Sequence, residues 1–307
     1  MVNVAVAGGT GGVGRTIIEV LESSPHTGFT LSRKAPENPN SNQLTVNYND
    51  ITQLVTVLEE RKIHTIICAF SIEGDSLAKS QANLIEAAEL SKETKRFIPS
   101  SFAIPYPRES IQVLPQLKDY FKAIETLKQS DLQYTVFHNG IFLDYFRSPD
   151  MKSYLKPNVF VIDLANRVAA IPGDGNVSVT FTYTFDLARF VVAVLDLDEW
   201  TDESRVIGDE MSWNGFVEMA ERVLDTKFEI HYDSVTKLKR FEITELPGHQ
   251  ALYAHFPKKP FQWFMSIFEL FTTDETSRLP REGSLNERFP DIRPLTVEQL
   301  LEKYWSI

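Results

Sequence analysis

The chain has 307 residues, of which 43% are hydrophobic and 24% charged, and its formal net charge is −11 at neutral pH. A chain of this length buries a large core without disulfides or metals, and its acidic balance argues against a nucleic-acid or anionic-membrane partner. The only cysteine, Cys68, excludes an intrachain disulfide framework and a cysteine-rich zinc module. Because no apolar run approaches 18 residues either, the composition predicts a cytoplasmic protein.

The first half alternates short β-branched runs with helical patterns, which is typical of βα units on a parallel sheet. We therefore expect an α/β fold with a Rossmann-like, doubly wound parallel sheet. The expected strands are residues 2–7, 29–31, 44–46, 65–70, 96–99 and 134–137, and the expected helices are 16–21, 51–60, 81–90 and 117–129.

The pattern loosens after about residue 147, where we expect strands over 177–183 and 228–232 and helices over 186–195, 213–224 and 295–305. The last of these helices begins with Thr296 and Gln299, which resemble a capping box. The sequence predicts a Rossmann-like domain over 1–150 with 177–208 packing back on it, a smaller discontinuous lobe over 151–176 and 209–290, and a C-terminal helix within 291–307.

A glycine-rich turn lies between the first expected strand and the first expected helix. Glycine permits positive φ, lets a pyrophosphate approach the backbone and lets the helix lie close to its strand, while the helix N-terminus offers free N–H groups to the phosphates. The spacing Gly8-x-x-Gly11-x-x-Gly14 is typical of short-chain dehydrogenase-type enzymes. The predicted dinucleotide contacts in this turn are Gly8, Thr10, Gly11, Gly12, Val13 and Gly14.

The end of the second strand predicts which dinucleotide binds. NAD sites usually carry an acid there for the ribose 2′-hydroxyl, but this chain has Arg33 and Lys34, with no acid until Glu37. Two cations attract a 2′-phosphate, which favours NADP(H), although both are also ordinary residues of a solvated loop. Asp50, after the third strand, is either an adenine contact or the N-cap of the following helix.

Several motifs together resemble the NmrA-like and isoflavone-reductase-like atypical short-chain dehydrogenases, and fungal members of that branch in particular. They are the glycine turn with Arg33, the run from Lys95 to Phe102, Leu132 to Val136, Gly140 to Leu143, and Phe181 to Phe190 with Asp186. The resemblance covers roughly the first 200 residues. Many fungal members of this branch serve secondary metabolism.

The resemblance implies that the domain over 1–150 binds NADP(H) and that the smaller lobe is a substrate lobe for a small molecule. It also implies a lysine on the helix before the Tyr-Thr strand that contacts cofactor and substrate. Lys122 is the best candidate, since a cation there stabilises an oxyanion as hydride arrives. The alternative is a surface lysine on a helix that also carries Lys118 and Lys128. The further cofactor contacts implied are Phe70, Ser71, Asn139 and Gly140.

This chain departs from the family pattern in two places. The Tyr-x-x-x-Lys pair is absent, because Lys118 precedes Lys122 by four residues, and an ungapped plant register places Tyr120 where the lysine stands. The usual Ser-Glu-Phe-Gly after the fifth strand is Ser100-Ser101-Phe102-Ala103, without the glutamate. Ser100 or Ser101 orients a substrate carbonyl or caps the loop.

The remaining candidates are histidines and aromatic residues. His138 follows the sixth strand and is either a general acid or a hydrogen-bonded structural residue. The expected substrate-pocket residues are Phe102, Phe142, Tyr145 and Phe146. His249 precedes and His255 lies within an aromatic stretch, 253–271, that forms either a pocket wall or core. No histidine spacing predicts a metal site.

These features predict an NADPH-dependent reductase of a conjugated or aromatic carbonyl compound. Two alternatives stay open: an NADP-sensing regulatory protein without turnover, and a cofactor-binding isomerase or cyclase with no net redox change. The substrate and the oligomeric state are not predicted, because function resides in the site and not in the fold.

Overall fold

The structure is a computed structural model that describes residues 1–38, 41–71 and 76–306. The chain forms two compact units. The first comprises Met1–Phe102, Tyr106–His138 and Leu187–Arg205, and the second comprises Ala103–Pro105, Asn139–Asp186 and Val206–Ile307. Residues 139–150 and 177–186 thus fall in the second unit, because the strand at Ile141 pairs with the strand at Phe181 and not with the main sheet. The domain boundaries expected from the sequence stay a prediction.

The first unit is built on a parallel sheet of six strands in the order β3-β2-β1-β4-β5-β6. Val4, Ala5, Val6 and Ala7 are fully buried, as expected for a strand covered on both faces. This order confirms the doubly wound fold, and its switch point between β1 and β4 is where such sheets bind ligands. The strands are β1 (Asn3–Ala7), β2 (Thr27–Ser32), β3 (Gln43–Thr45), β4 (Ile63–Cys68), β5 (Arg96–Ile98) and β6 (Gln133–Tyr134).

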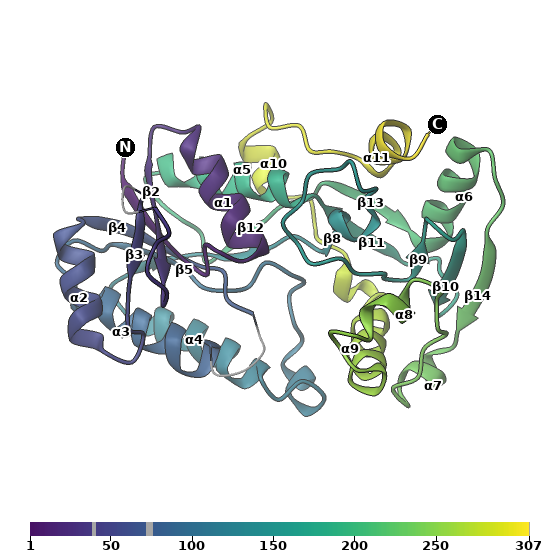
Figure 1. Ribbon diagram of the computed structural model, residues 1–307, viewed down its shortest axis with the longest axis horizontal. Coiled ribbons are helices and arrows are strands. Elements are labelled where there is room, and N and C mark those ends of the chain that lie inside the picture. The colour runs from purple at the N-terminus through teal and green to yellow at the C-terminus, as the bar shows by residue number, and fades with distance from the viewer. Residues whose placement is uncertain (39–40, 72–75, 307) are drawn as a thin grey trace. The chain divides into compact units, whose positions relative to one another are not determined.

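Helices cover both faces of this sheet. Figure 1 shows α2, α3 and α4 in a row along one side and α1 and α5 on the other. Asp50 is the N-cap of α2, since its carboxylate accepts from the Gln53 amide at 2.9 Å. A π-helical turn (Leu77–Gln81) leads into α3, and a 3₁₀ turn (Arg108–Gln112) precedes α4. The helices are α1 (Gly12–Glu22), α2 (Ile51–Glu60), α3 (Ala82–Leu90), α4 (Leu117–Gln129) and α5 (Thr184–Ala193).

The expected strand 134–137 is divided between two sheets, so that prediction needs a correction. The chain leaves β5 after Tyr134, and β7 (Val136–His138) pairs instead with β12 (Glu203–Arg205). At the division, the hydroxyls of Thr135 and Ser204 lie 2.8 Å apart. A partner so distant along the chain leaves no local signal in the sequence.

Arg96 attaches the segment after α5 to the main sheet. Its buried guanidinium donates to the carbonyls of Leu195, Leu197 and Asp198 at 2.7–3.3 Å and lies 5.0 Å from the centre of the Trp200 ring. One cation therefore satisfies three carbonyls that follow the helix end.

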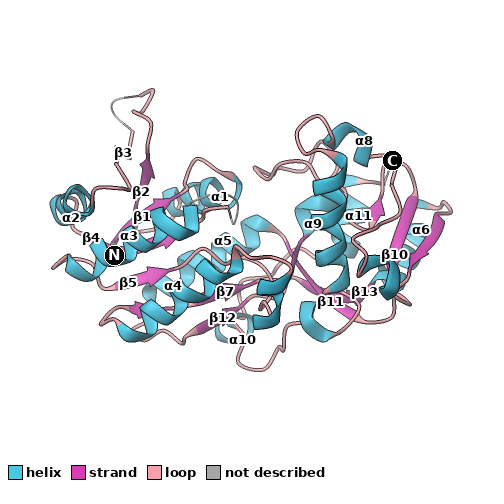
Figure 2. Cartoon of the chain, turned by 90° about the horizontal axis from the view of Figure 1, so that it is seen from below, coloured by secondary structure: helices cyan, strands magenta, loops and turns pink. Residues whose placement is uncertain are grey.

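The second unit contains two three-stranded sheets, β14-β10-β9 and β13-β11-β8. Phe146, Phe181, Trp213 and Phe216 pack together in its core. Figure 2 shows α6 beside β10. The elements are β8 (Ile141–Phe142), β9 (Ile162–Asp163), β10 (Val168–Pro172), β11 (Ser178–Thr182), β13 (Asp209–Ser212), β14 (Glu229–Asp233), α6 (Trp213–Leu224), α7 (Val235–Leu238), α8 (His249–Leu252), α9 (Lys258–Leu270), α10 (Leu285–Arg288) and α11 (Val297–Tyr304), with 3₁₀ turns at Leu143–Phe146 and Glu275–Ser277. The 3₁₀ turn at Val194–Asp196 belongs to the first unit.

The structure of the second unit bears on two expectations, the capping box at Thr296 and the role of the aromatic stretch 253–271. The capping box is present at α11, where the Thr296 hydroxyl and the Gln299 side chain exchange hydrogen bonds with backbone amides. Of the aromatic residues in the stretch 253–271, Phe261 is buried in the core, whereas Phe264 and Phe268 are partly buried against it, so a role of the stretch as a pocket wall stays a prediction. None of the helices in the described part of the chain is long and apolar enough to cross a membrane.

Candidate functional site

The glycine turn joins β1 to α1 through contacts that admit no side chain. Gly8 has φ +81°, and a Cβ there would lie 2.5 Å from the carbonyl oxygen of Ala69. A Cβ on Gly14 would lie 2.3 Å from the carbonyl oxygen of Gly8, whereas one on Gly11 meets that atom only at 3.3 Å. Gly8 and Gly14 are therefore required by packing, and Gly11 is not.

The N-terminus of α1 is available to an anion. Gly11 is the N-cap and offers no side-chain acceptor, and the first turn carries no acidic residue. The first amides of a helix have no partner within the helix, and the helix dipole adds positive potential at this end. Thr10, exposed beside them, and Gly12 and Val13 belong to this same end. The geometry fits a pyrophosphate.

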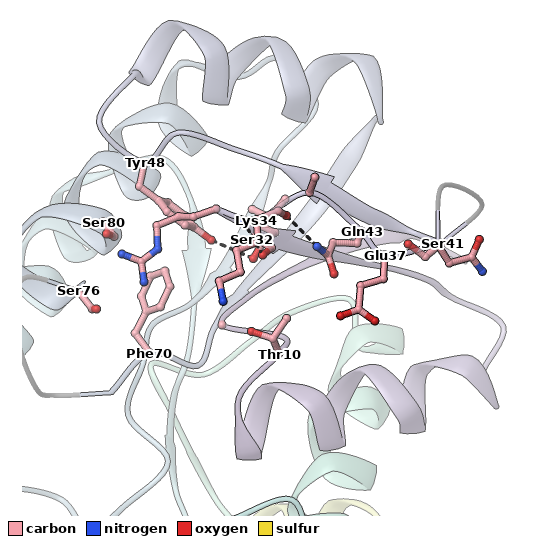
Figure 3. Close-up of a pocket in the computed structure, with 15 residues that line it drawn as sticks. Thr10, Ser32, Lys34, Glu37, Ser41, Gln43, Tyr48, Phe70, Ser76 and Ser80 are labelled. Atoms are coloured by element: carbon pink, nitrogen blue, oxygen red, sulfur yellow. Dashed lines mark hydrogen bonds between the residues drawn. The ribbon is translucent and has the colours of Figure 1, made fainter. Parts of the chain in front are cut away.

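A hollow of about 520 Å³ opens beside this helix end (Figure 3). Its walls come from the glycine turn, from the carboxyl ends of β2 and β4, and from the π-helical turn. The lining residues are Gly8, Thr10, Leu31, Ser32, Arg33, Lys34, Ala35, Glu37, Asn38, Ser41, Gln43, Tyr48, Phe70, Ser76 and Ser80. The hollow thus unites three separate predictions: the glycine turn, the paired cations and Phe70.

Both cations of the hollow are exposed, and within the described ranges neither side chain forms an ion pair. The Arg33 charge also acts on Tyr48: burial raises the pKa of the Tyr48 phenol, and the guanidinium opposes that rise. Lys34 is fixed through its backbone, whose N–H donates to the Ser32 hydroxyl at 3.1 Å and whose carbonyl accepts from Gln43 at 2.8 Å. An incoming phosphate therefore has two cations available to it.

Tyr48 is a residue of the hollow that the sequence analysis missed. Its hydroxyl donates to the Leu31 carbonyl at 3.2 Å, and its ring meets the Phe70 ring edge-on with centroids 5.4 Å apart. Ser76 and Ser80 were missed as well. All three follow the carboxyl end of a parallel strand, the position where open sheets bind ligands, and that was the signal available. Ser71 adjoins Phe70 but is not part of the lining.

The two serines after β5 are engaged by the backbone. The Ser100 hydroxyl donates to the Phe70 carbonyl at 2.7 Å, and its N–H donates to the Gln81 side chain at 2.7 Å. The Ser101 hydroxyl accepts from the Phe137 amide at 3.1 Å. These bonds connect the segment after β5 to the segment after β4 and to β7, as the loop-capping alternative expects. A substrate contact by either serine stays a prediction.

Lys122 is exposed on α4, as are Lys118 and Lys128. Tyr120, which the ungapped register places in the lysine position, lies on the buried face, where its ring packs on Tyr106 with centroids 5.4 Å apart. Burial raises the pKa of the Tyr120 phenol, so this group is a poor proton donor near neutral pH. Of the two registers, only the one through Lys122 offers an accessible cation.

His138 ends β7 and Phe102 lies in the segment after β5, both in the first unit. His138 is buried at the end of β7, opposite Arg205 of β12. Phe102 has φ +43°, a left-handed conformation that is strained for an aromatic residue, and its ring packs on Phe137 with centroids 5.9 Å apart. Strain of this kind recurs at ligand sites.

The remaining predicted residues belong to the second unit. Asn139 is fully buried and its side chain donates to the Gly140 carbonyl at 3.2 Å. Gly140 has φ +70°, and a Cβ there would lie 2.2 Å from the Thr180 carbonyl oxygen. The rings of Phe142 and Tyr145 meet edge-on at 6.1 Å, whereas Phe146 is core. Burial raises the pKa of Tyr145 to about 12.

Other reactive side chains have structural surroundings. Cys68 is buried in β4, where desolvation raises the pKa of its thiol, as expected for an unreactive cysteine. His249 is buried, and its Nδ1 accepts from the Leu246 amide at 3.1 Å, whereas His255 is exposed. Within the described ranges, no three His, Cys, Asp or Glu side chains are grouped to hold a metal ion.

Comparison with known proteins identifies the family. The model of the NmrA-like family matches residues 2–276. The chain is 35% identical to Oxidoreductase BOA1 of Botryotinia fuckeliana over 96% of each chain, and 24% identical to phenylcoumaran benzylic ether reductase TP7 of Nicotiana tabacum over 97% of each. Among solved structures, the binary complex of leucoanthocyanidin reductase with NADPH from Vitis vinifera matches with a TM-score of 0.74 and 17% identity, over 98% of this chain and 99% of that one. The chain belongs to the NmrA-like family.

Proposed function

We propose that this protein is an NADPH-dependent reductase of a conjugated or aromatic carbonyl-type small molecule in secondary metabolism. The observation that carries the proposal is the hollow of the first unit. It is lined by Gly8, which admits no Cβ, and by two exposed cations, and it opens beside a helix N-terminus without side-chain acceptors. The relatives support it, since they are named oxidoreductases and reductases along nearly the whole chain. Net charge and cysteine content support a cytoplasmic location.

Each part of the hollow corresponds to a part of the cofactor. The first amides of α1 bind the pyrophosphate, Arg33 and Lys34 bind the ribose 2′-phosphate, and the Tyr48–Phe70 pair gives an aromatic wall for the adenine. Arginine can grip a phosphate with two parallel N–H bonds, so Arg33 contributes geometry as well as charge. A bound nicotinamide supplies the hydride.

The role we assign to Lys122 is electrostatic. When a carbonyl carbon accepts hydride, or a conjugated carbon accepts it and the charge moves to oxygen, negative charge develops on that oxygen. An ammonium group beside the oxygen stabilises this charge. The proton that completes the reduction comes from His138, a tyrosine or water. The accessible position of Lys122 on α4 supports this role over Tyr120.

One observation favours a rival function. The hydroxyls of Ser100 and Ser101 are already bonded to backbone groups, which leaves fewer groups to orient a substrate oxygen. This suits a protein that senses NADP(H) without turnover. Such a protein binds NADP⁺ and NADPH with different affinities and consumes neither.

The binding arm of the test is a calorimetric titration with NADPH and NADH. Wild-type protein should bind NADPH more tightly than NADH, and Arg33→Ala should weaken NADPH binding about tenfold while changing NADH binding little, because only NADPH carries the 2′-phosphate. Arg61→Ala, an exposed arginine that follows α2, is the matched control. No binding of either nucleotide would rule out the reductase and the sensor together.

The turnover arm follows NADPH absorbance with a panel of conjugated ketones, lactones and phenolic ethers. A reductase consumes NADPH only when its substrate is present, and Lys122→Ala should remove turnover while leaving NADPH affinity within about threefold. Lys128→Ala, one exposed lysine further along α4, should leave both unchanged. A product formed without loss of NADPH indicates an isomerase or cyclase instead.

A further inference from the structure

The hollow that receives the adenosine end of the cofactor contains a negative charge. Glu37 is exposed and lines the hollow together with Arg33 and Lys34. Figure 3 shows the Lys34 ammonium and the Glu37 carboxylate both directed toward the side of the hollow where Thr10 lies. Lys34 and Glu37 form no ion pair with each other or with any other described residue, so neither charge is neutralised by a neighbour.

This carboxylate acts oppositely on the two nucleotides. The 2′-phosphate carries between one and two negative charges near neutral pH. Two unit charges about 4 Å apart in water interact strongly enough to change an affinity about fivefold. NADH has a hydroxyl in place of the phosphate, and an acidic residue near the end of the second strand is the usual acceptor for that hydroxyl.

The position of Glu37 in the chain allows it both to repel a 2′-phosphate and to accept a hydrogen bond from a 2′-hydroxyl. It lies five residues beyond the end of β2, in the loop that leads to β3. The loop is attached near both of its ends, at Lys34 through Gln43 and at Thr30 through Asn42. Glu37 is therefore carried on a segment whose ends are fixed to the sheet, and it lines the same hollow as the two cations.

We propose that Glu37 limits the preference of this site for NADPH over NADH, by repelling the 2′-phosphate and by accepting a hydrogen bond from the ribose 2′-hydroxyl of NADH. This inference rests on the proposed cofactor function and adds that the site binds both nucleotides. Arg33 and Lys34 set the direction of the preference, and Glu37 sets its size.

The experiment compares dissociation constants for NADPH and NADH in wild-type protein, Glu37→Gln and Glu37→Lys by calorimetry at fixed ionic strength. Glu37→Gln keeps the shape and removes the charge, so NADPH should bind about threefold to fivefold more tightly and NADH more weakly. Glu37→Lys should shift the ratio further in the same direction. Glu60→Gln, which makes the same change in net charge at the exposed C-terminal end of α2, should leave the ratio unchanged.

Two fragments locate the effect. Adenosine 2′,5′-bisphosphate should show the NADPH-type change on Glu37→Gln, and adenosine 5′-monophosphate the NADH-type change, since they differ only in the 2′-phosphate. If wild-type protein binds neither NADPH nor NADH, the proposed function and this inference are both wrong. If it binds them and the Glu37 variants keep the wild-type ratio, only this inference is wrong. An equal shift in Glu60→Gln also overturns it, because the effect is then one of net charge.

Discussion

The glycines of the β1–α1 turn have two separate physical tasks. Gly14 is a packing residue, because its Cα lies so near the Gly8 carbonyl that a methyl group would overlap it. Gly11 has φ −90° and ψ 176°, which any residue adopts, and a Cβ there would be only moderately close to its neighbour. Packing alone therefore does not require glycine at position 11, and we propose that the approach of a ligand does.

This difference can be measured with two alanine substitutions. Gly14→Ala should lower the free energy of unfolding by about 3 kcal/mol or more, because backbone must move to admit the methyl group. Gly11→Ala should cost about 1 kcal/mol or less yet weaken NADPH binding at least about tenfold, since the methyl group occupies space beside the first amides of α1. Thermal melts and calorimetric titrations give the two quantities. Normal NADPH affinity in Gly11→Ala would place the pyrophosphate elsewhere.

At the scale of single residues, the sequence predicts those whose place in the fold follows from their position just after a strand. The glycine spacing, the cations after β2 and Phe70 all lie at the hollow because strand ends carry them there. The partners of Ser100 and Ser101 were not predictable, because they are backbone groups of Phe70 and Phe137, which are distant along the chain. Tyr48 follows the end of β3, which was a signal for it, but its contact with Phe70 depends on the order of the strands in the sheet, which the sequence does not show.

At the scale of elements, periodicity identified most helices and strands of the first unit, whereas in the second unit it missed strands such as β10 and β13, and pairing partners were less predictable throughout. The first five expected strands all appear in the parallel sheet, as β1 to β5. The sixth was divided, because Val136 donates to the Asp202 carbonyl at 2.8 Å and so joins a strand that follows α5. A run of apolar residues indicates a strand but does not show which other strand it pairs with.

Helix α9 also contains a feature that its amphipathic pattern does not predict. Glu269 is 2% exposed on the buried face, and its buried Oε2 accepts no hydrogen bond from the described residues. Burial, and next the negative charge of Asp233, raise the pKa of this carboxyl well above its usual range, while Lys237 opposes the shift. The folded state therefore favours the protonated, neutral form.

The pH dependence of stability follows from this shift. A carboxyl whose folded pKa is raised above its unfolded value of about 4.3 destabilises the fold progressively as pH rises from that value toward the folded pKa. Glu269→Gln removes this loss, so the stability difference between variant and wild type should grow in favour of the variant from pH 5 to pH 8, by at most about 1.4 kcal/mol per pH unit. Chemical denaturation at several pH values measures it. Glu218→Gln, an exposed glutamate of α6, is the control; a flat difference for Glu269→Gln would mean that the carboxyl is ionised in the fold.

At the scale of the whole chain, the family match ends at residue 276, but the second unit does not. The last thirty residues are attached at several points. Asn286 exchanges two hydrogen bonds with the backbone of Ile207, at 2.7 and 2.9 Å. The carboxylate of Asp186 accepts from the Leu295 amide at 2.6 Å, and that of Asp209 from the Val297 amide at 2.9 Å. These bonds make the C-terminal segment part of the core.

The end of this segment also supports residues predicted for the substrate. The Trp305 indole donates to the Phe146 carbonyl at 2.8 Å, at the end of the 3₁₀ turn Leu143–Phe146 that carries Tyr145. The same turn is fixed from its other side by Asp144, whose carboxylate accepts from the Thr184 amide at 2.9 Å and from the Thr184 hydroxyl at 2.6 Å. If Tyr145 lines the substrate pocket, the C-terminus positions it.

A truncated chain that ends at Pro290 tests how far this support reaches. It loses Val297, Leu300 and Leu301, which are fully buried, so the second unit should lose several kcal/mol of stability. Because each compact unit has its own core, amide hydrogen exchange should accelerate in α6 and in the Leu143–Phe146 turn, while β1 and β4 keep their protection and NADPH binding persists. A chain lacking only Ser306 and Ile307 is the control. Equal loss of protection in both units would show that they unfold as one cooperative body. The stability of the glycine turn would then depend on the whole chain.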